Sequence, residues 1–141
     1  MADILQGGGY EPLKSGDTLP TIFRKVAKNF KALIWWLTTE DITSELVRTN
    51  AVQTIHSMSA TRSGNTVTIS VLFTCASAGA SGVVMFRLGK YRPKSNDRTP
   101  AVTYTGGGYG SALGLLTVNG DLSLQCNALQ PINSVSFTYQ I

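Results

Sequence analysis

Long apolar runs are missing from this chain of 141 residues. No run approaches the ~20 apolar residues that a membrane-spanning helix requires. Residues 2 to 12 also lack the apolar segment of a secretory signal peptide. We therefore expect no membrane insertion, and we expect any exit from a cell to use another route.

Charge and cysteine are also scarce. Charged residues make up 14% of the chain, against about 25% in an average soluble domain. Gly, Ser, Thr and Asn are abundant instead, a balance typical of β-rich extracellular or virion surfaces. Cys75 and Cys126 are too few for a disulfide framework, and they can be either one bridge or two thiols.

The residue types that catalysis needs are thinly spread. His56 is the single histidine, and no acidic residue lies near it in sequence to orient its ring. The acids are scattered, so a paired-carboxylate glycosidase site has no positive sign in the sequence. One histidine and two distant cysteines do not make a zinc pattern. The glycine-rich 106–110 lacks the lysine and hydroxyl residue of a phosphate-binding loop. We expect no enzyme activity, no metal and no cofactor.

Basic residues outnumber acidic ones, for a net charge of +4. One basic group precedes residue 38, and a second lies in the middle of the chain, where Asp97 is the lone acid. Such a patch can attract nucleic acid, an anionic glycopolymer or a membrane, so its sign alone does not choose a partner, and it can also be a solvated face. We expect no nucleic-acid partner. The two groups are Lys14, Arg24, Lys25, Lys28 and Lys31, and Arg62, Arg87, Lys90, Arg92, Lys94 and Arg98.

Residues 1–16 have three consecutive glycines, a proline and no hydrophobic period. We expect an extended arm that is mobile when alone. Its isolated apolar residues can order on a partner surface, and the alternative is a disordered leader. These residues are Ile4, Leu5, Tyr10 and Leu13.

The segment 17–42 is predicted to contain a helix with a heptad seam. Asp17 or Thr18 can cap its first turn, and Pro20 stands where a missing N–H is tolerated. The apolar residues repeat at steps of four and three, the pattern of helices that pair with copies of themselves. With Phe23 at heptad position a, the basic residues fall at b, c or f and point outward. The seam is Leu19, Phe23, Val26, Phe30, Leu33 and Leu37.

The bulk of phenylalanine at position a favours three strands over two. The alternatives are a single amphipathic helix packed on its own β domain, since Ile22, Ala27 and Ile34 widen the apolar face, or a helix lying in a membrane interface. Trp35 and Trp36 follow at f and g, so we expect at least one to protrude and to need a cover.

From Thr43 onward the period is two, which predicts an antiparallel β-sandwich, jelly-roll-like by its seven or eight strands. Residues 66–75 alternate most cleanly, and 62–65 form the turn before them. Asn119 and Gly120 predict a hairpin with a type I′ turn. Residues 89–100 and 106–111 are expected as loops. The remaining predicted strand segments are 47–58, 83–88, 101–104, 113–118, 122–127 and 135–141.

The two loop regions supply candidate partner contacts. Tyr91, Tyr104 and Tyr109 can form a sugar-stacking or protein-contact platform, and the basic residues of the first loop can meet an anionic partner. Ordinary strand-end tyrosines and a structural connector are the alternatives. The candidate contacts are Tyr91, Arg92, Lys94, Arg98, Tyr104 and Tyr109.

Two parts of the chain resemble known proteins. GDTLPTIFRKVAKNFKAL, residues 16–33, resembles the opening of bacteriophage fibre and neck or head-appendage proteins. MFRLGKYRPKSNDRTPAV, LGLLTVNGDLSLQCNA and VSFTYQI resemble the β head of phage receptor-binding and baseplate fibre proteins. The resemblance implies a homotrimeric virion fibre, assembled in the bacterial host cytoplasm, whose arm attaches to other virion proteins and whose head binds a host-surface saccharide.

We therefore expect a virion-attachment arm at 1–16, a trimerisation helix at 17–42 and a β-sandwich head at 43–141. Two other functions remain open at this point. One is a non-adhesive capsid or neck decoration or connector protein of the same architecture. The other is a small glycan-binding or glycan-hydrolysing β-sandwich module that acts without a particle.

Overall fold

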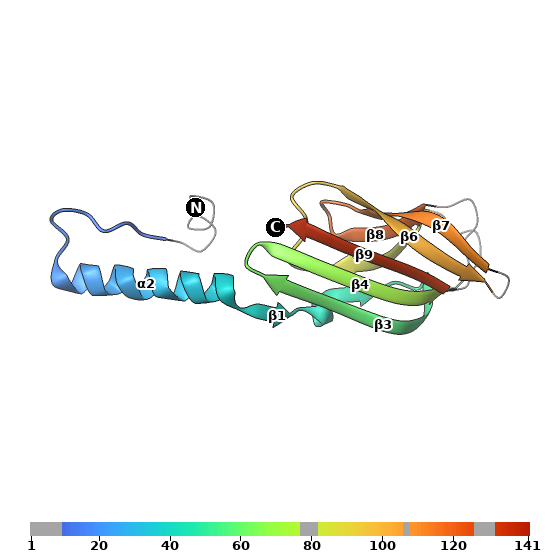
Figure 1. The fold of residues 1–141 in the computed structure, drawn as a ribbon, viewed down its shortest axis with the longest axis horizontal. Helices are drawn as coiled ribbons and strands as arrows, with labels where there is room; N and C mark the ends of the chain where they lie inside the picture. The colour runs from blue at the N-terminus through green and yellow to red at the C-terminus, as the bar shows by residue number, and fades with distance from the viewer. Residues whose placement is uncertain (1–9, 77–81, 106–107, 126–131) are drawn as a thin grey trace. The chain divides into compact units, whose positions relative to one another are not determined.

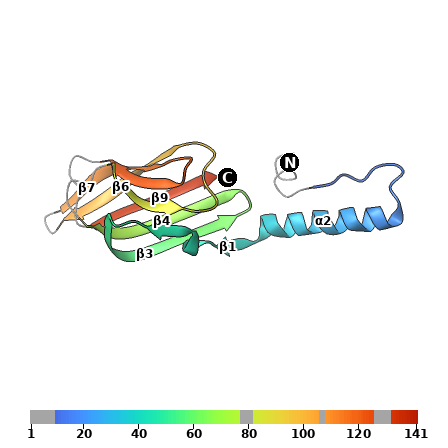
Figure 2. The ribbon, with the colours of Figure 1, turned by 180° about the vertical axis from the view of Figure 1, so that it is seen from behind.

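The computed structural model describes residues 10–76, 82–105, 108–125 and 132–141, and the chain divides into two compact units (Figures 1 and 2). The helical unit holds Met1–Glu40 with Ser63–Asn65, and the β unit holds Asp41–Arg62 with Thr66–Ile141. The predicted fold class, mainly antiparallel β with one helix near the N-terminus, is confirmed.

Helix α2, Leu19–Leu37, starts close to the predicted position. Pro20 lies in its first turn, where no intrahelical partner is available for an N–H. The prediction of a side-chain capping hydrogen bond at this end of the helix is wrong. Thr18 is the N-cap residue, but its hydroxyl pairs with that of Thr21 at 3.0 Å and bonds no backbone amide.

Helix α2 is shorter at its C-terminal end than the predicted 17–42, because Thr38 leaves the helical conformation. Its ψ is 128°, in the extended region. Its amide and its hydroxyl both donate to the carbonyl of Ile34, at 2.9 and 2.8 Å, so the last turn is closed by a β-branched residue.

Within the described residues, nine strands form one sheet in the order β1-β3-β4-β9-β6-β7-β8-β5-β2. A short 3₁₀ helix, η1 at Thr43–Glu45, precedes β2. The strands are β1 Thr39–Asp41, β2 Leu46–Arg48, β3 Val52–Ser63, β4 Thr66–Cys75, β5 Val84–Leu88, β6 Asp97–Thr105, β7 Gly108–Leu116, β8 Asp121–Gln125 and β9 Ile132–Gln140.

Strands β4 and β9 form a long ladder, from Thr66↔Gln140 to Thr74↔Ile132, and lie side by side in Figure 1. The alternation predicted for β4 is confirmed, since every second side chain is buried. The buried residues of β4 are Val67, Ile69, Val71, Phe73 and Cys75.

The sheet curls over a single apolar core. Phe73 on β4 and Phe86 on β5 make an edge-to-face contact with ring centroids 5.1 Å apart, although four strands separate β4 from β5 in the sheet. The two ends of the sheet therefore face each other across the core, which gives the sandwich-like shape of the β unit.

The predicted loops 89–100 and 106–111 are partly strand, because β6 starts at Asp97 and β7 starts at Gly108. Pro100 pairs with Leu113 of β7, while pairing of β6 with β9 starts only at Ala101. Proline is tolerated at such a position because its missing N–H is needed by one neighbour at most.

Gly114 in β7 makes room for the core, since a Cβ there would lie 2.6 Å from Val135 Cγ2 and 2.9 Å from Phe137 Cζ.

The hairpin between β7 and β8 is confirmed, but its turn is not the predicted type I′. Gly120 has a φ of +84°, whereas Asn119 has no positive φ. The Gly120 amide donates to the Thr117 carbonyl at 2.8 Å, and the Thr117 amide donates to the Asp121 carbonyl at 3.0 Å. This three-residue loop ends in a left-handed glycine, the second commonest hairpin geometry.

Candidate functional site

The apolar seam of α2 is exposed in the single chain. All six predicted seam residues stand on the surface, with exposed fractions between 48% and 75%. The two buried helix residues, Lys25 and Ala32, are both at heptad position c. Within the described residues, the chain therefore covers position c of its own helix, whereas the a/d face is exposed.

The cover on the outer face includes a strap, which we define as residues 10–17 (Figure 1). Its backbone is held at Glu11 by Asn29, whose Oδ1 accepts from the Glu11 amide at 2.8 Å while its Nδ2 donates to the Glu11 carbonyl at 3.0 Å. The amide side chain thus bonds both backbone groups of one residue, as a neighbouring strand would.

Charged contacts hold the rest of the strap. Lys25 is only 8% exposed, and its Nζ donates to the Pro12 carbonyl at 3.0 Å and to Asp17 Oδ2 at 2.8 Å. Glu11 pairs with Arg24 at 3.1 Å and with Lys28. The prediction that these basic residues all point into solvent is therefore wrong for Lys25, because it did not anticipate the returning chain.

These contacts favour the ionised carboxylates. The hydrogen bond from Lys28 is the main cause that lowers the pKa of Glu11 below its ordinary value, with Arg24 adding to it. The hydrogen bond from Lys25 is the main cause that lowers the pKa of Asp17, followed by the Lys14 amide. The strap is thus held best when both acids are charged.

The strap also changes the expected arm. The arm at residues 1–16 is predicted to be mobile when alone, but residues 11 and 12 are hydrogen-bonded to α2. Tyr10 and Leu13 remain exposed and available to a partner, while Ile4 and Leu5 lie outside the described residues. Trp35 and Trp36 are both half-buried and meet edge to face, with ring centroids 6.0 Å apart.

In the β unit, the segment 89–96 is shaped around Tyr91. Its φ of +57° is unusual for a bulky residue. Its carbonyl accepts a hydrogen bond from the Tyr139 hydroxyl at 2.9 Å, and burial raises the pKa of Tyr139. Lys90 Nζ and the Arg62 guanidinium lie 4.9 and 5.7 Å from the Tyr91 ring centre. Tyr91 is thus engaged within its own unit.

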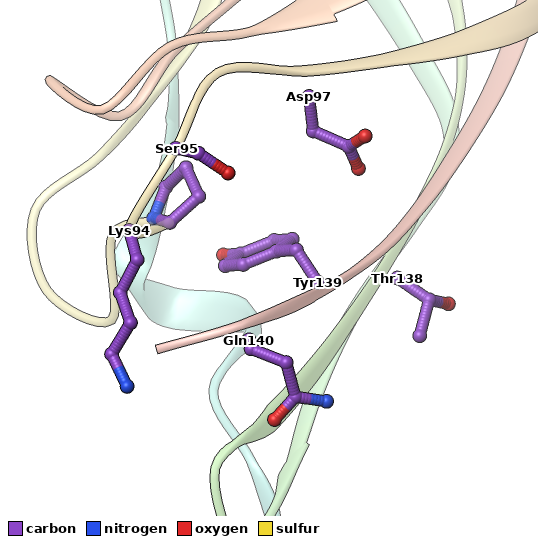
Figure 3. A pocket seen from close by; sticks show the side chains of 7 residues that line it. Lys94, Ser95, Asp97, Thr138, Tyr139 and Gln140 are labelled. Carbon is purple, nitrogen blue, oxygen red and sulfur yellow. The ribbon is translucent and has the colours of Figure 1, made fainter.

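Beside this segment lies a shallow hollow of about 220 Å³ (Figure 3). Figure 3 shows Tyr139 between Lys94 and Thr138, with Asp97 above and Gln140 below. The volume is below the ~300 Å³ at which small-molecule sites begin, so the hollow can hold little more than one polar group. The lining residues are Pro93, Lys94, Ser95, Asp97, Thr138, Tyr139 and Gln140.

The predicted partner contacts do not form one site. Arg98 and Tyr104 lie near opposite ends of β6, six residues apart, which is about 20 Å of strand. Arg92 and Lys94 belong to the segment that precedes β6 and, like Arg98, are exposed. The structure thus separates a basic group from the tyrosine group at the β6–β7 turn.

The tyrosine group is a cross-strand pair. Tyr104 of β6 lies opposite Tyr109 of β7, with ring centroids 5.2 Å apart and planes inclined at 50°. Tyr109 is 83% exposed and Tyr104 is 38% exposed. Val102, two residues before Tyr104 and on the same side of β6, is 51% exposed. The sequence named the tyrosines but not their pairing, which depends on the β6–β7 register.

The reactive side chains of His56 and Cys75 make structural contacts. His56 Nε2 lies 2.8 Å from the Thr74 hydroxyl on the neighbouring strand. Cys75 is buried and accepts a hydrogen bond from Asn133 Nδ2 at 3.1 Å, while Cys126 lies outside the described residues. Within the described ranges, no cluster of three potential metal ligands occurs, and α2 is not apolar enough to cross a membrane.

Comparison with known proteins adds a structural likeness. No protein-family model and no curated protein matches the sequence. The fold is similar to that of the receptor binding protein (gp15) of Listeria phage PSA, with a TM-score of 0.58 and 14% sequence identity. The match covers 90% of this chain and 83% of that chain. The likeness therefore establishes a shared fold over most of the chain.

Proposed function

We propose that the chain is a structural protein of a bacteriophage virion that adheres to the host surface. Its helical unit assembles three copies, and its β unit binds a host-surface saccharide. The observation that carries the proposal is the fold shared with a phage receptor binding protein over 90% of the chain. The exposed heptad seam of α2 supports the assembly step, since six large apolar side chains on one helix face need a partner.

The strap supports the same arrangement. It is bonded to α2 through Lys25 at heptad position c and Asn29 at position g, both off the a/d seam, so each copy can keep its strap while the seams meet. Tyr10 and Leu13 stay exposed on the strap and can contact other virion proteins. Localisation on the virion surface follows from this proposal, as does a binding role that needs no catalytic step.

The assembly is tested by mass measurement in solution. Phe23→Asp with Phe30→Asp places charge on the seam, and we expect a trimer mass for the native chain and a monomer mass for this double variant, by size-exclusion chromatography with light scattering. Lys31→Asp is the matched control, because it changes charge on the exposed outer face of the same helix and should leave the mass unchanged. A native monomer, or a double variant that keeps the native mass, would refute the seam.

Adhesion is tested with the labelled full chain on candidate host cells. We expect saturable binding that competes with intact virions. If the protein assembles and is present in virions yet binds no host cell, the adhesion proposal is wrong, and a decoration or connector role takes its place.

A further inference from the structure

The β unit has a large surface without charge. The chain carries no Asp, Glu, Lys or Arg in the stretches 63–86, 99–120 and 122–141. These stretches supply β4, β7 and β9 entirely, and most of β6 and β8. The charged residues of the β unit are thus confined to the other segments, which include the basic group before β6.

The outward side of the β4–β9 ladder is built from hydroxyl groups. Thr68 pairs with Thr138 at 3.3 Å, and Ser70 pairs with Ser136 at 3.0 Å, each across the two strands and all exposed. Hydroxyl groups both donate and accept hydrogen bonds. A ligand with many hydroxyls can therefore bond to this surface without an ionic group on either side.

The tyrosine pair adds an apolar platform at one end of the same sheet. Strand β6, which carries Tyr104, is the neighbour of β9, and Tyr104 lies opposite Ile132. With Tyr109 at 83% exposed and Val102 at 51%, the platform lies on the surface of the described part of the β unit. An aromatic face packs well against the C–H groups of a sugar ring while the phenol remains solvated.

We infer that the saccharide ligand of the proposed adhesion function is uncharged, and that it binds on Tyr104 and Tyr109 and not on the basic group. This inference rests on the proposed function and adds the ligand's charge and its place. An anionic polymer would be drawn instead to Arg92, Lys94 and Arg98, and its binding would weaken with salt. The charge-free face offers no such attraction.

The test measures binding of the full chain to host cells and to immobilised neutral oligosaccharides, with dextran sulfate as the anionic probe. We expect Tyr109→Ala to weaken binding by about tenfold, because it removes the exposed ring of the pair. Tyr109→Phe keeps the ring and should stay close to the native affinity. Affinity should change by less than about twofold between about 0.05 and 0.5 M salt.

The double variant Lys94→Ala with Arg98→Ala is the matched control and should bind as the native chain does. The inference is wrong if the native chain binds cells but Tyr109→Ala binds equally well. It is also wrong if binding is lost in the basic-group control or falls steeply with salt. A change in assembled mass caused by Tyr109→Ala would show that a second copy occupies the platform. Failure of the native chain to bind any cell would instead refute the adhesion function itself.

Discussion

Replacing Gly120 by alanine tests the geometry of the β7–β8 hairpin. The φ of +84° costs an L-residue about 1 kcal/mol or more. A Cβ there would lie only 2.6 Å from the Leu88 carbonyl oxygen, so backbone would have to move. That movement endangers the bond from the Leu88 amide to the Gly120 carbonyl, 2.8 Å long and worth about 1 kcal/mol. We expect Gly120→Ala to lower the free energy of unfolding by about 2–3 kcal/mol.

Gly82 and Gly114 separate the cost of backbone strain from the cost of a close contact. Gly82 also has a positive φ, +76°, but a Cβ there meets nothing within 4 Å, so Gly82→Ala should cost about 1 kcal/mol from backbone strain alone. Gly114 has no positive φ, and its Cβ would press on Val135 and Phe137, so Gly114→Ala should cost about 1–3 kcal/mol from overpacking.

Urea unfolding of the three variants, followed by circular dichroism and extrapolated linearly, gives the free energies. Gly120→Ala should be clearly less stable than Gly82→Ala, at an unchanged slope. Equal losses for these two variants would show that the close approach of Gly120 to Leu88 does not exist in solution.

Three further outcomes can be measured. Asn29→Ala should reduce the hydrogen-exchange protection of the Glu11 amide by about tenfold, because both backbone bonds of Glu11 lose their partner, and unchanged protection would refute the strap. The pKa of Glu11 is lowered in the folded state, so the stabilisation from its carboxylate is present above the unfolded pKa and is lost as pH falls through the folded pKa. Protection of the Glu11 amide, corrected for intrinsic exchange, should therefore be full at pH 7 and decrease below about pH 4.5. A flat pH profile would contradict the pairing of Glu11 with Lys28 and Arg24. Tyr139→Phe should lower the free energy of unfolding by about 1 kcal/mol, because the Tyr91 carbonyl loses its donor, while Tyr104→Phe, on the surface, should change it little.

The sheet was largely predictable because its signals are local. The alternation of Val67, Ile69 and Val71 follows directly from the two-residue period of a half-buried strand. The hairpin at Asn119 and Gly120 was also found. Its turn type was not, because the position of Gly120 against Leu88 depends on a strand that is distant in the sequence.

Where glycine or proline has a long-range role, reading it as a loop signal fails. Gly110 falls in the predicted loop 106–111 but lies within β7, where a Cβ would lie 2.7 Å from Thr103 Oγ1. Pro100 lies within a strand because the ladder with β9 starts after it. A single sequence does not reveal such packing, since the neighbours are supplied by the curl of the sheet.

The candidate functional residues likewise divide into those predictable from local sequence and those that depend on distant parts of the chain. The sequence supplied the tyrosines and the seam of α2, whose period is local. It did not supply the strap, because Lys25 and Asn29 look like ordinary solvent-facing residues until the preceding segment turns back onto them. The pairing of Tyr104 with Tyr109 likewise depends on register.

The direction of the strap determines where a label or an added peptide can be attached to the helical unit. Because Glu11 is bonded to Asn29, the chain at residue 10 lies beside the middle of α2, and the turn at Lys14 and Asp17 precedes its first residue. A fluorophore attached at residue 10 would therefore lie along the flank of the helix. Gly16 has open space around it and a φ of +94°, so a short peptide inserted at this turn would project from the end of the helical unit.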